Sequence, residues 1–149
     1  MRIKTITCHD VYNFGASLQA YALQQFLVGR GHQVEIIDYL PTYKRFYEWL
    51  KICELGFIGN LGVKLPFFKP IVALSQHRKW LKERLKIYRF KSFKKNKLSC
   101  TKQSYKSIEE LISNKPEADL YIAGSDQIWN TAFLNGLDPA YYCMFEKDK

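Results

Sequence analysis

The sequence predicts an α/β fold in which helices flank a parallel β-sheet. Two short apolar segments enclose a segment of helical periodicity within residues 1–41, a third apolar segment ends in a polar loop at 124–130, and 47% of the 149 residues are hydrophobic. A strand–helix–strand unit of this length pairs its strands in parallel, because the helix crosses one face of the sheet before the chain re-enters it. These observations predict one Rossmann-like domain over residues 1–149.

The amino-terminal unit begins with an apolar strand over residues 3–8, followed by a polar, glycine-containing loop over 9–15. The next segment has helical periodicity, and Gly31 lies where a left-handed residue would end the helix. A buried strand over 34–39 follows, and Pro41 terminates it. The predicted helix is amphipathic, with Ala16, Ala20, Leu23 and Leu27 on its apolar stripe and Ser17, Gln24 and Gln25 pointing elsewhere.

Residues 42–106 are interpreted as a basic, helical insertion within this domain. From 42 to 74, aromatic and basic residues alternate with glycine and proline, which is typical of short helices and irregular turns. Residues 75–95 regain a helical pattern. Its apolar face is predicted to contain Leu81, Leu85 and Tyr88.

The carboxyl-terminal part of the chain contains a short helix and a third strand. Ser107 and Glu110 match a capping box that opens a helix through Ile112. Residues 119–123 then form a buried strand that runs into the polar loop 124–130. Three strands are few for a doubly wound sheet, so we expect an unpaired sheet edge and, with it, association or instability.

The net charge of +9 is concentrated in one segment. Residues 78–106 contain twelve basic residues and one acidic residue, Glu83, which leaves −2 for the rest of the chain. Such a segment favours anionic partners. Its interleaved aromatic residues suit RNA or an anionic membrane, and the alternative is a solvated helix face that packs on the sheet through those aromatics.

Cysteine and histidine positions predict neither disulfides nor a metal site. The cysteines at positions 8, 53, 100 and 143 form no C-x-x-C pair, and His9, His32 and His77 have no ligand-like spacing. The amino terminus has no apolar run of signal-peptide length, and charges and prolines interrupt the apolar stretch 55–74. We therefore expect a cytoplasmic protein without a membrane span.

The loops after the first and third predicted strands are the candidate site, because both would leave a parallel sheet at the same edge, where ligands bind. In the first loop, Asn13, Gly15 and Ser17 precede or open a helix whose free N–H groups favour an anion. The alternative is that Asn13 or Gly15 only caps the helix or forms a tight turn.

The second loop contains side chains that suit a sugar. Asp126 can accept hydrogen bonds from hydroxyls, Gln127 and Asn130 can donate and accept, and Trp129 offers a flat apolar face. The alternative is that Ile128 and Trp129 are core anchors while Asp126 caps the next turn.

Three segments together resemble the amino-terminal half of the polysaccharide pyruvyl transferase family. They are Asn13-Phe-Gly-Ala-Ser-Leu-Gln-Ala-Tyr-Ala-Leu23, Gly31-His-Gln-Val-Glu-Ile-Ile-Asp-Tyr39 with Pro41, and Gly124-Ser-Asp-Gln-Ile-Trp-Asn130. The resemblance implies a transferase that moves a pyruvyl group from phosphoenolpyruvate to a sugar hydroxyl as a ketal, in the biosynthesis of cell-surface or capsular polysaccharide. It also implies a fold similar to one half of a two-domain GT-B transferase.

In that family, the arginine and histidine residues associated with phosphoenolpyruvate belong to the carboxyl-terminal half, and this chain ends at Lys149. The resemblance thus implies an acceptor-side domain that is inactive alone, with a sugar or lipid-linked saccharide as its ligand and a complementing carboxyl-terminal half as a partner. No cofactor is expected, and phosphoenolpyruvate is the donor substrate. From the chemistry of the two loops we predict substrate-binding residues and no catalytic residue. Asp126, Gln127, Trp129 and Asn130 are the expected sugar contacts, with Ser125 in the same loop, and the floor of the cleft is shaped by Asn13, Gly15 and Ser17.

Two classes of function therefore remain open. Within the family interpretation, residues 78–106 could contact the inner face of an anionic membrane, where lipid-linked acceptors are located. The competing interpretation is a non-catalytic basic module that binds an anionic membrane surface or RNA through the same residues. A specific nucleic-acid partner is not expected.

Overall fold

A computed structural model describes residues 1–42, 69–124, 126–130 and 137–146, with the side chains of 69–81, 83, 126 and 127 outside the description. The turns and short helices expected within 43–68 lie outside the described residues. The chain divides into two compact units, one formed by Met1–Thr42 with Phe90–Lys149 and the other by Tyr43–Arg89. The second unit is shorter than the insertion expected over 42–106, because residues 90–106 belong to the first unit.

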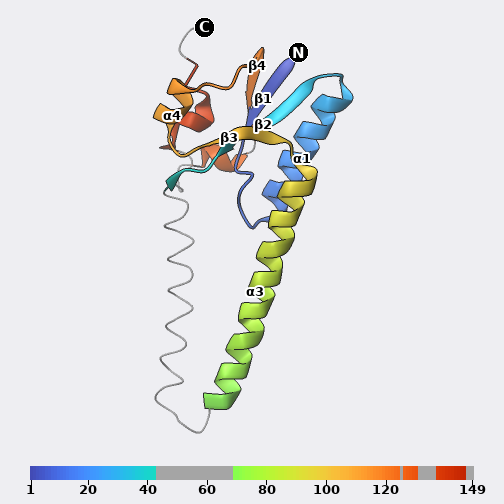
Figure 1. The fold of residues 1–149 in the computed structure, drawn as a ribbon, viewed down its shortest axis with the longest axis vertical. Helices are drawn as coiled ribbons and strands as arrows, with labels where there is room; N and C mark the ends of the chain where they lie inside the picture. Colours follow the sequence, from blue (N-terminus) through green and yellow to red (C-terminus); the bar gives the residue numbers. More distant parts are fainter. Residues whose placement is uncertain (43–68, 125, 131–136, 147–149) are drawn as a thin grey trace. The chain divides into compact units, whose positions relative to one another are not determined.

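The first unit is built on a four-stranded parallel sheet of order β3-β2-β1-β4 (Figure 1). Its strands are β1 (Arg2–Ile6), β2 (Gln33–Tyr39), β3 (Cys100–Tyr105) and β4 (Leu120–Ala123). Strand β1 lies between β2 and β4, with Thr5 paired to both Ile36 and Ile122. The predicted α/β, Rossmann-like parallel arrangement is confirmed.

Strand β3 was not predicted, and it lies inside the range interpreted as a helical insertion. Its sequence, Cys-Thr-Lys-Gln-Ser-Tyr, has no apolar alternation, and only Tyr105 in it is buried. The strand is nevertheless held in place by backbone hydrogen bonds, because Ile36 N–H donates to Ser99 O at 2.8 Å and Leu40 N–H to Tyr105 O at 2.7 Å. A polar edge strand of this kind gives no pattern that a sequence can reveal.

Helix α1 (Phe14–Gly29) crosses from β1 to β2, and Gly31 has a positive φ of 83° just beyond it. Its buried side chains are Ser17, Ala20 and Gln24. The prediction that Ser17 and Gln24 point away from the buried face was therefore wrong. Gln24 can be buried because backbone groups satisfy its side-chain amide. Its Nε2 donates to Val34 O and Ser99 O, and its Oε1 accepts from Ser99 N–H. Local periodicity cannot predict bonds to residues so far along the chain.

Helix α3 (Lys69–Lys97) starts earlier than the 75–95 predicted. Leu85 and Tyr88 are 50% and 71% exposed, so the expected apolar face is wrong for both, and the side chain of Leu81 is not described. The helix instead buries Phe90, with Leu98 buried directly after its end. The ring centroid of Phe90 lies 4.8 Å from that of Phe14.

Helix α4 (Ile108–Ser113) starts at the predicted capping box. The Ser107 hydroxyl accepts from Glu110 N–H at 3.4 Å, and the Glu110 carboxylate accepts from Lys106 N–H at 2.7 Å. Two 3₁₀ helices, η2 (Asp126–Trp129) and η4 (Pro139–Tyr142), follow β4.

The core has one buried cluster on each face of the sheet. Adjacent residues of a strand point to opposite faces, and Ile36 and Ile37 belong to different clusters. Ile36 packs with Ala20 of α1 and with Leu98. On the other face, Ile37 packs with residues of β1, α4, η2 and η4, including Ile6, Leu111, Ile128 and Tyr141.

Candidate functional site

The loops after β1 and β4 leave the sheet at the same edge. These strands are parallel neighbours, with Ile6 opposite Ala123, and Gly124 N–H donates to Ile6 O at 3.0 Å. This confirms the shared edge that the sequence predicts for the two loops. Ligands of open α/β sheets bind outside this carboxyl edge.

Gly124 lets the end of β4 approach helix α1 closely. A Cβ at this position would lie 2.9 Å from Leu23 Cδ2 and 3.2 Å from Gln19 Nε2. The first of these distances is shorter than real Cβ contacts allow. Gln19 is itself fixed to the sheet, because its Oε1 accepts a hydrogen bond from Thr7 Oγ1 at 3.3 Å.

In the first loop, Asn13 is the N-cap of α1, and its Oδ1 accepts a hydrogen bond from Ala16 N–H at 3.2 Å. The capping alternative therefore describes Asn13 in this structure. A Cβ on Gly15 would lie 3.2 Å from the same Asn13 oxygen, so a glycine leaves room for the cap. Ser17, in the first turn, is 6% exposed and lines a pocket.

In the second loop, the structure separates an anchor from an exposed aromatic residue. Ile128 is fully buried in the core, as the core-anchor alternative predicts, whereas Trp129 is 52% exposed. Asn130 is half-buried and engaged with a partner. Ser125 and the side chains of Asp126 and Gln127 lie outside the described residues.

A pocket lies at this edge between the β1 exit loop, the start of α1 and the last turns of α3. Its enclosed space is small, with room for about one water molecule. Ser17 is the predicted site residue that lines it, and none of the described residues of the β4 exit loop does. Most of its polar and aromatic character comes from residues that the sequence analysis did not select, among them His9, Asp10, Tyr12, Phe90 and Lys94.

Asp38, near the end of β2, is the centre of a polar network beside this pocket. Its Oδ1 lies 2.8 Å from both His9 Nε2 and Lys94 Nζ, and its Oδ2 accepts a hydrogen bond from Ser104 Oγ. Burial alone would raise the pKa of Asp38, but the hydrogen bonds from these three residues outweigh burial and lower the pKa well below its ordinary value of 3.8. Asp38 is therefore a buried, ionised carboxylate.

His9 and Lys94 connect this carboxylate to the pocket. The His9 ring is buried, and its Nδ1 lies 3.2 Å from Thr7 O. Lys94 also binds Asp10, with 3.1 Å between Nζ and Oδ1. Burial acts to lower the pKa of Lys94, but its hydrogen bond with Asp38 and the two carboxylate charges outweigh burial and raise the pKa. Lys94 is thus held as an ammonium between Asp10, which follows β1, and Asp38 in β2.

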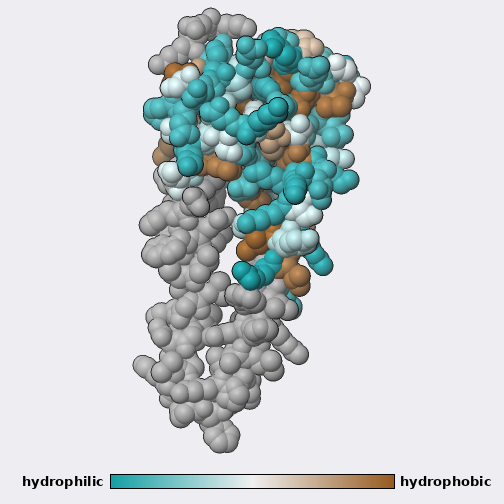
Figure 2. Space-filling model, in the orientation of Figure 1, coloured by the Kyte–Doolittle hydropathy of each residue, from teal (hydrophilic) through white to brown (hydrophobic). Residues whose placement is uncertain are grey.

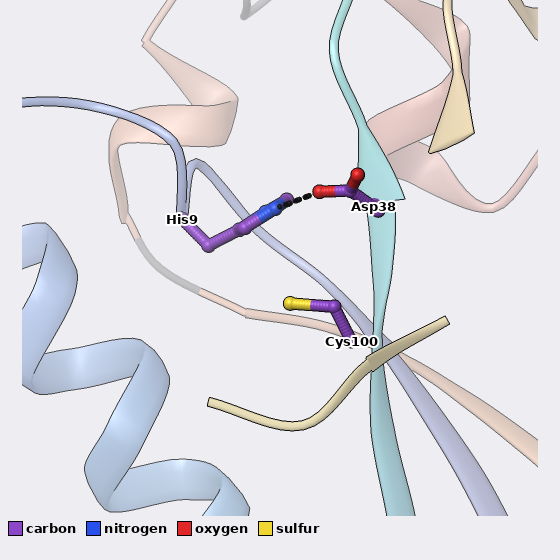
Figure 3. A group of neighbouring side chains, drawn as sticks. All are labelled: His9, Asp38 and Cys100. Atoms are coloured by element: carbon purple, nitrogen blue, oxygen red, sulfur yellow. Dashed lines mark hydrogen bonds and ion pairs between the residues drawn. The ribbon is translucent and has the colours of Figure 1, made fainter. Parts of the chain in front are cut away.

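Cys100, the first residue of β3, completes a cluster with His9 and Asp38 (Figure 3). One possible ligand atom from each residue lies within 4.8 Å of those of the other two. Burial raises the pKa of the Cys100 thiol to about 11. Among the described residues, these three side chains could hold a metal ion.

The sequence contained one signal for this network. Asp38 is an acidic residue within a strand whose neighbours Ile36, Ile37 and Tyr39 are all buried, and a buried charge requires partners. The partners themselves were not predictable, because His9 precedes Asp38 by 29 residues and Lys94 follows it by 56.

Comparison with protein families gives a match over most of the chain. A family model described as Polysaccharide pyruvyl transferase matches residues 13–149. No curated protein and no solved structure matches the chain significantly.

Proposed function

The chain belongs to the polysaccharide pyruvyl transferase family, and we propose that it takes part in pyruvyl transfer from phosphoenolpyruvate to a sugar of a cell-surface or capsular polysaccharide. In this reaction, two sugar hydroxyl oxygens bond to the central carbon of the enolpyruvyl group and the phosphate leaves. One of the displaced protons goes to the methylene carbon, which becomes a methyl group, and the other leaves with phosphate. The role proposed for this domain is to bind and orient the acceptor sugar.

The observation that supports this role is the shared edge of the two exit loops. Ile6 and Ala123 end neighbouring parallel strands, so the segments 7–17 and 124–130 start side by side. Orienting two hydroxyls of one sugar toward a single carbon requires contacts on more than one side of the ring. Two loops at one edge can supply such contacts.

The side chains at this edge have the chemistry that sugars require. The Asp10 carboxylate and the Lys94 ammonium, 3.1 Å apart, can accept from and donate to hydroxyl groups. Tyr12 offers apolar surface beside them, and its ring packs 6.0 Å, centroid to centroid, from that of the buried Phe90. Trp129 adds an exposed indole in the other loop, and rings of this kind pack against the C–H face of a sugar.

The test is saccharide binding by NMR, with methyl glycosides of glucose, galactose and N-acetylglucosamine as probes. We expect shifts in the Trp129 indole N–H signal, identified by its loss in Trp129→Phe. We also expect Trp129→Ala and Asp126→Ala to weaken the affinity about tenfold, or ~1.4 kcal/mol each.

The matched control is Tyr88→Ala, which removes an aromatic residue that is 71% exposed on α3. This variant should bind the same glycosides with unchanged affinity. Binding that is unaffected by both loop variants would remove the β4 exit loop from the acceptor site. An absence of binding by the wild-type chain to all three glycosides would contradict the acceptor role.

A second candidate function is peripheral contact between α3 and an anionic membrane. No helix among the described residues is both long and apolar enough to cross a bilayer. On α3, however, exposed Leu85 and Tyr88 lie among exposed cations, and Figure 2 shows apolar and polar residues mixed along this described stretch. Such a surface suits an anionic headgroup layer. The exposed cations are Lys82, Arg84, Lys86, Arg89, Lys91, Lys95 and Lys97.

Vesicle sedimentation tests this second candidate. The protein should bind phosphatidylcholine vesicles that contain phosphatidylglycerol and dissociate from them as the salt concentration is raised. It should not bind vesicles of phosphatidylcholine alone. The double variant Lys86→Glu, Arg89→Glu should lose most binding, while the charge-conserving Lys86→Arg, Arg89→Lys should keep it. Retention on RNA without vesicle binding would assign the basic helix to a nucleic acid and reject the membrane proposal.

A further inference from the structure

The network beside the pocket contains three side chains with metal-binding chemistry from three different segments. His9 follows β1, Asp38 lies in β2 and Cys100 begins β3, and their ligand atoms lie within 4.8 Å of one another. Figure 3 shows the three side chains close together, with the contact between His9 and Asp38 dashed. The spacing of cysteine and histidine along the chain did not predict this group, because the sheet order brings it together.

Two of the three side chains are oriented by further contacts, as metal ligands commonly are. His9 Nε2 donates to Asp38 Oδ1, and Nδ1 lies 3.2 Å from Thr7 O. When a metal takes Nε2, the imidazole keeps its proton on Nδ1, where the Thr7 carbonyl accepts it. Ser104 holds the Asp38 Oδ2 atom, which leaves Oδ1 for another partner. Histidine ligands are usually held by a carbonyl or carboxylate on their second nitrogen in this way.

Lys94 provides a cation at this position. Its Nζ lies 2.8 Å from Asp38 Oδ1, the atom that a metal would use. Asp10 lies 3.1 Å from the same ammonium, so Lys94 keeps a carboxylate partner if it leaves Asp38. Because Lys94 lines the pocket, the position that it vacates can be reached from the pocket.

We propose that His9, Asp38 and Cys100 form a binding site for a divalent transition-metal ion of the zinc type, which displaces Lys94. One imidazole, one carboxylate and one thiolate are ligands that zinc accepts, and three protein ligands leave its fourth position for water or for a group in the pocket. Magnesium and calcium are excluded by the nitrogen and sulfur donors. The thiol proton of Cys100 leaves to solvent when the metal binds.

Cobalt(II) is the probe for this site, because a thiolate ligand gives it a charge-transfer band in the near ultraviolet. The full chain, first treated with a chelator, should develop this band on titration with cobalt, and zinc should remove it. Cys100→Ser should lose the band. Cys143→Ser, which removes a half-buried thiol elsewhere in the fold, should keep it.

The competing role of Lys94 gives a second measurement that does not require the loss of a ligand. Lys94→Met removes the ammonium that occupies the site, so it should tighten cobalt binding by about tenfold or more. A ligand variant such as Asp38→Asn should weaken binding by at least as much. The proposal is overturned if wild type shows no thiolate band, if Cys100→Ser keeps it, or if Lys94→Met binds cobalt no more tightly than wild type.

Discussion

Tyr39 illustrates how a single buried side chain makes this fold sensitive to pH. Its hydroxyl donates to Asp138 Oδ2 at 2.8 Å, and both residues are buried. Burial, together with the hydrogen bond and the charge of Asp138, raises the pKa of Tyr39 well above its ordinary value of 10.0. The phenol therefore stays protonated in the folded protein at pH values where it ionises in the unfolded chain.

Tyr39→Phe should lower the free energy of unfolding by about 1–2 kcal/mol at pH 7, because a charge-assisted hydrogen bond is lost and Asp138 stays buried. The stability from the raised pKa is fully present below pH 10 and is lost as the pH rises above it. The difference in unfolding free energy between wild type and variant should therefore be smaller above pH 10 than at pH 7. Urea unfolding at a pH above 10 and at pH 7 measures this. Tyr88→Phe is the exposed control, and a pH-independent difference would contradict the argument.

A second residue-scale prediction concerns the close approach at Gly124. Gly124→Ala should cost about 1–2 kcal/mol of unfolding free energy, because Leu23 and Gln19 have to move away from the added methyl group. The matched control is Gly29→Ala, where a Cβ meets nothing within 4 Å. That variant should be neutral or more stable by up to ~1 kcal/mol, since alanine favours the helix. Equal effects at the two positions in urea unfolding would refute the steric account.

At the scale of elements, Gln24 connects three segments through one amide. It joins α1 to the Val34 carbonyl of β2 and to both backbone polar groups of Ser99, which precedes β3. Ser99 O has a further partner in Ile36 N–H, whereas Gln24 supplies the hydrogen bond to Ser99 N–H. The polar face of α1 thus fixes where the unpredicted strand begins.

Gln24→Ala should destabilise the fold by about 2 kcal/mol, because the Ser99 N–H loses its protein acceptor and a small void forms. Hydrogen exchange should increase first at the Ser99 amide and in β3, before the amides of β1. Gln25→Ala, the exposed neighbour on the same helix, should change neither stability nor exchange. Slow exchange in β3 of Gln24→Ala would show that other contacts hold the strand.

The elements with a clear pattern were predictable, and those held by long-range contacts were not. The apolar runs predicted β1, β2 and β4, and the capping box predicted α4, because local chemistry decides these elements. Ser17 and Gln24 were predicted to lie off the buried stripe of α1 because they are polar, but both are buried. Strand β3 was missed because its hydrogen bonds with β2 stabilise it without an apolar pattern of its own.

The candidate site was predictable in position but not in composition. Parallel strands 3–8 and 119–123 were sufficient to place both exit loops at one edge. The order of the strands decides which other residues reach that edge, and order cannot be read from periodicity. Asp38 and Cys100 join His9 because β2 lies between β1 and β3, and Lys94 reaches them from α3.

At the scale of the whole sheet, β3 and β4 are the outer strands among the described residues. In β3 the side chains of Lys102, Gln103 and Ser104 are exposed. Polar and cationic residues at an edge disfavour pairing with another copy, because pairing would bury their charge and place like charges together. The association that the sequence predicts thus depends on how well these residues protect the edge.

Lys102→Val should increase self-association, because it gives the outer strand a β-branched apolar residue in place of a cation. Size-exclusion chromatography with light scattering should show a mass that rises with protein concentration. Lys106→Val, an equal change just beyond β3, should elute as wild type does. A Lys102→Val protein with the mass of wild type at every concentration would show that this lysine does not protect the edge.

The position of β1 inside the sheet has a consequence for synthesis on the ribosome. As the nascent chain emerges, β2 can pair with β1 once residues up to Tyr39 have left the exit tunnel, but β4 begins only at Leu120. Until then, the backbone N–H and C=O groups of β1 that pair with β4 in the folded protein are unpaired, and another extended chain can form hydrogen bonds with them. Chaperone dependence during translation should therefore end when the segment Leu120–Ala123 becomes available.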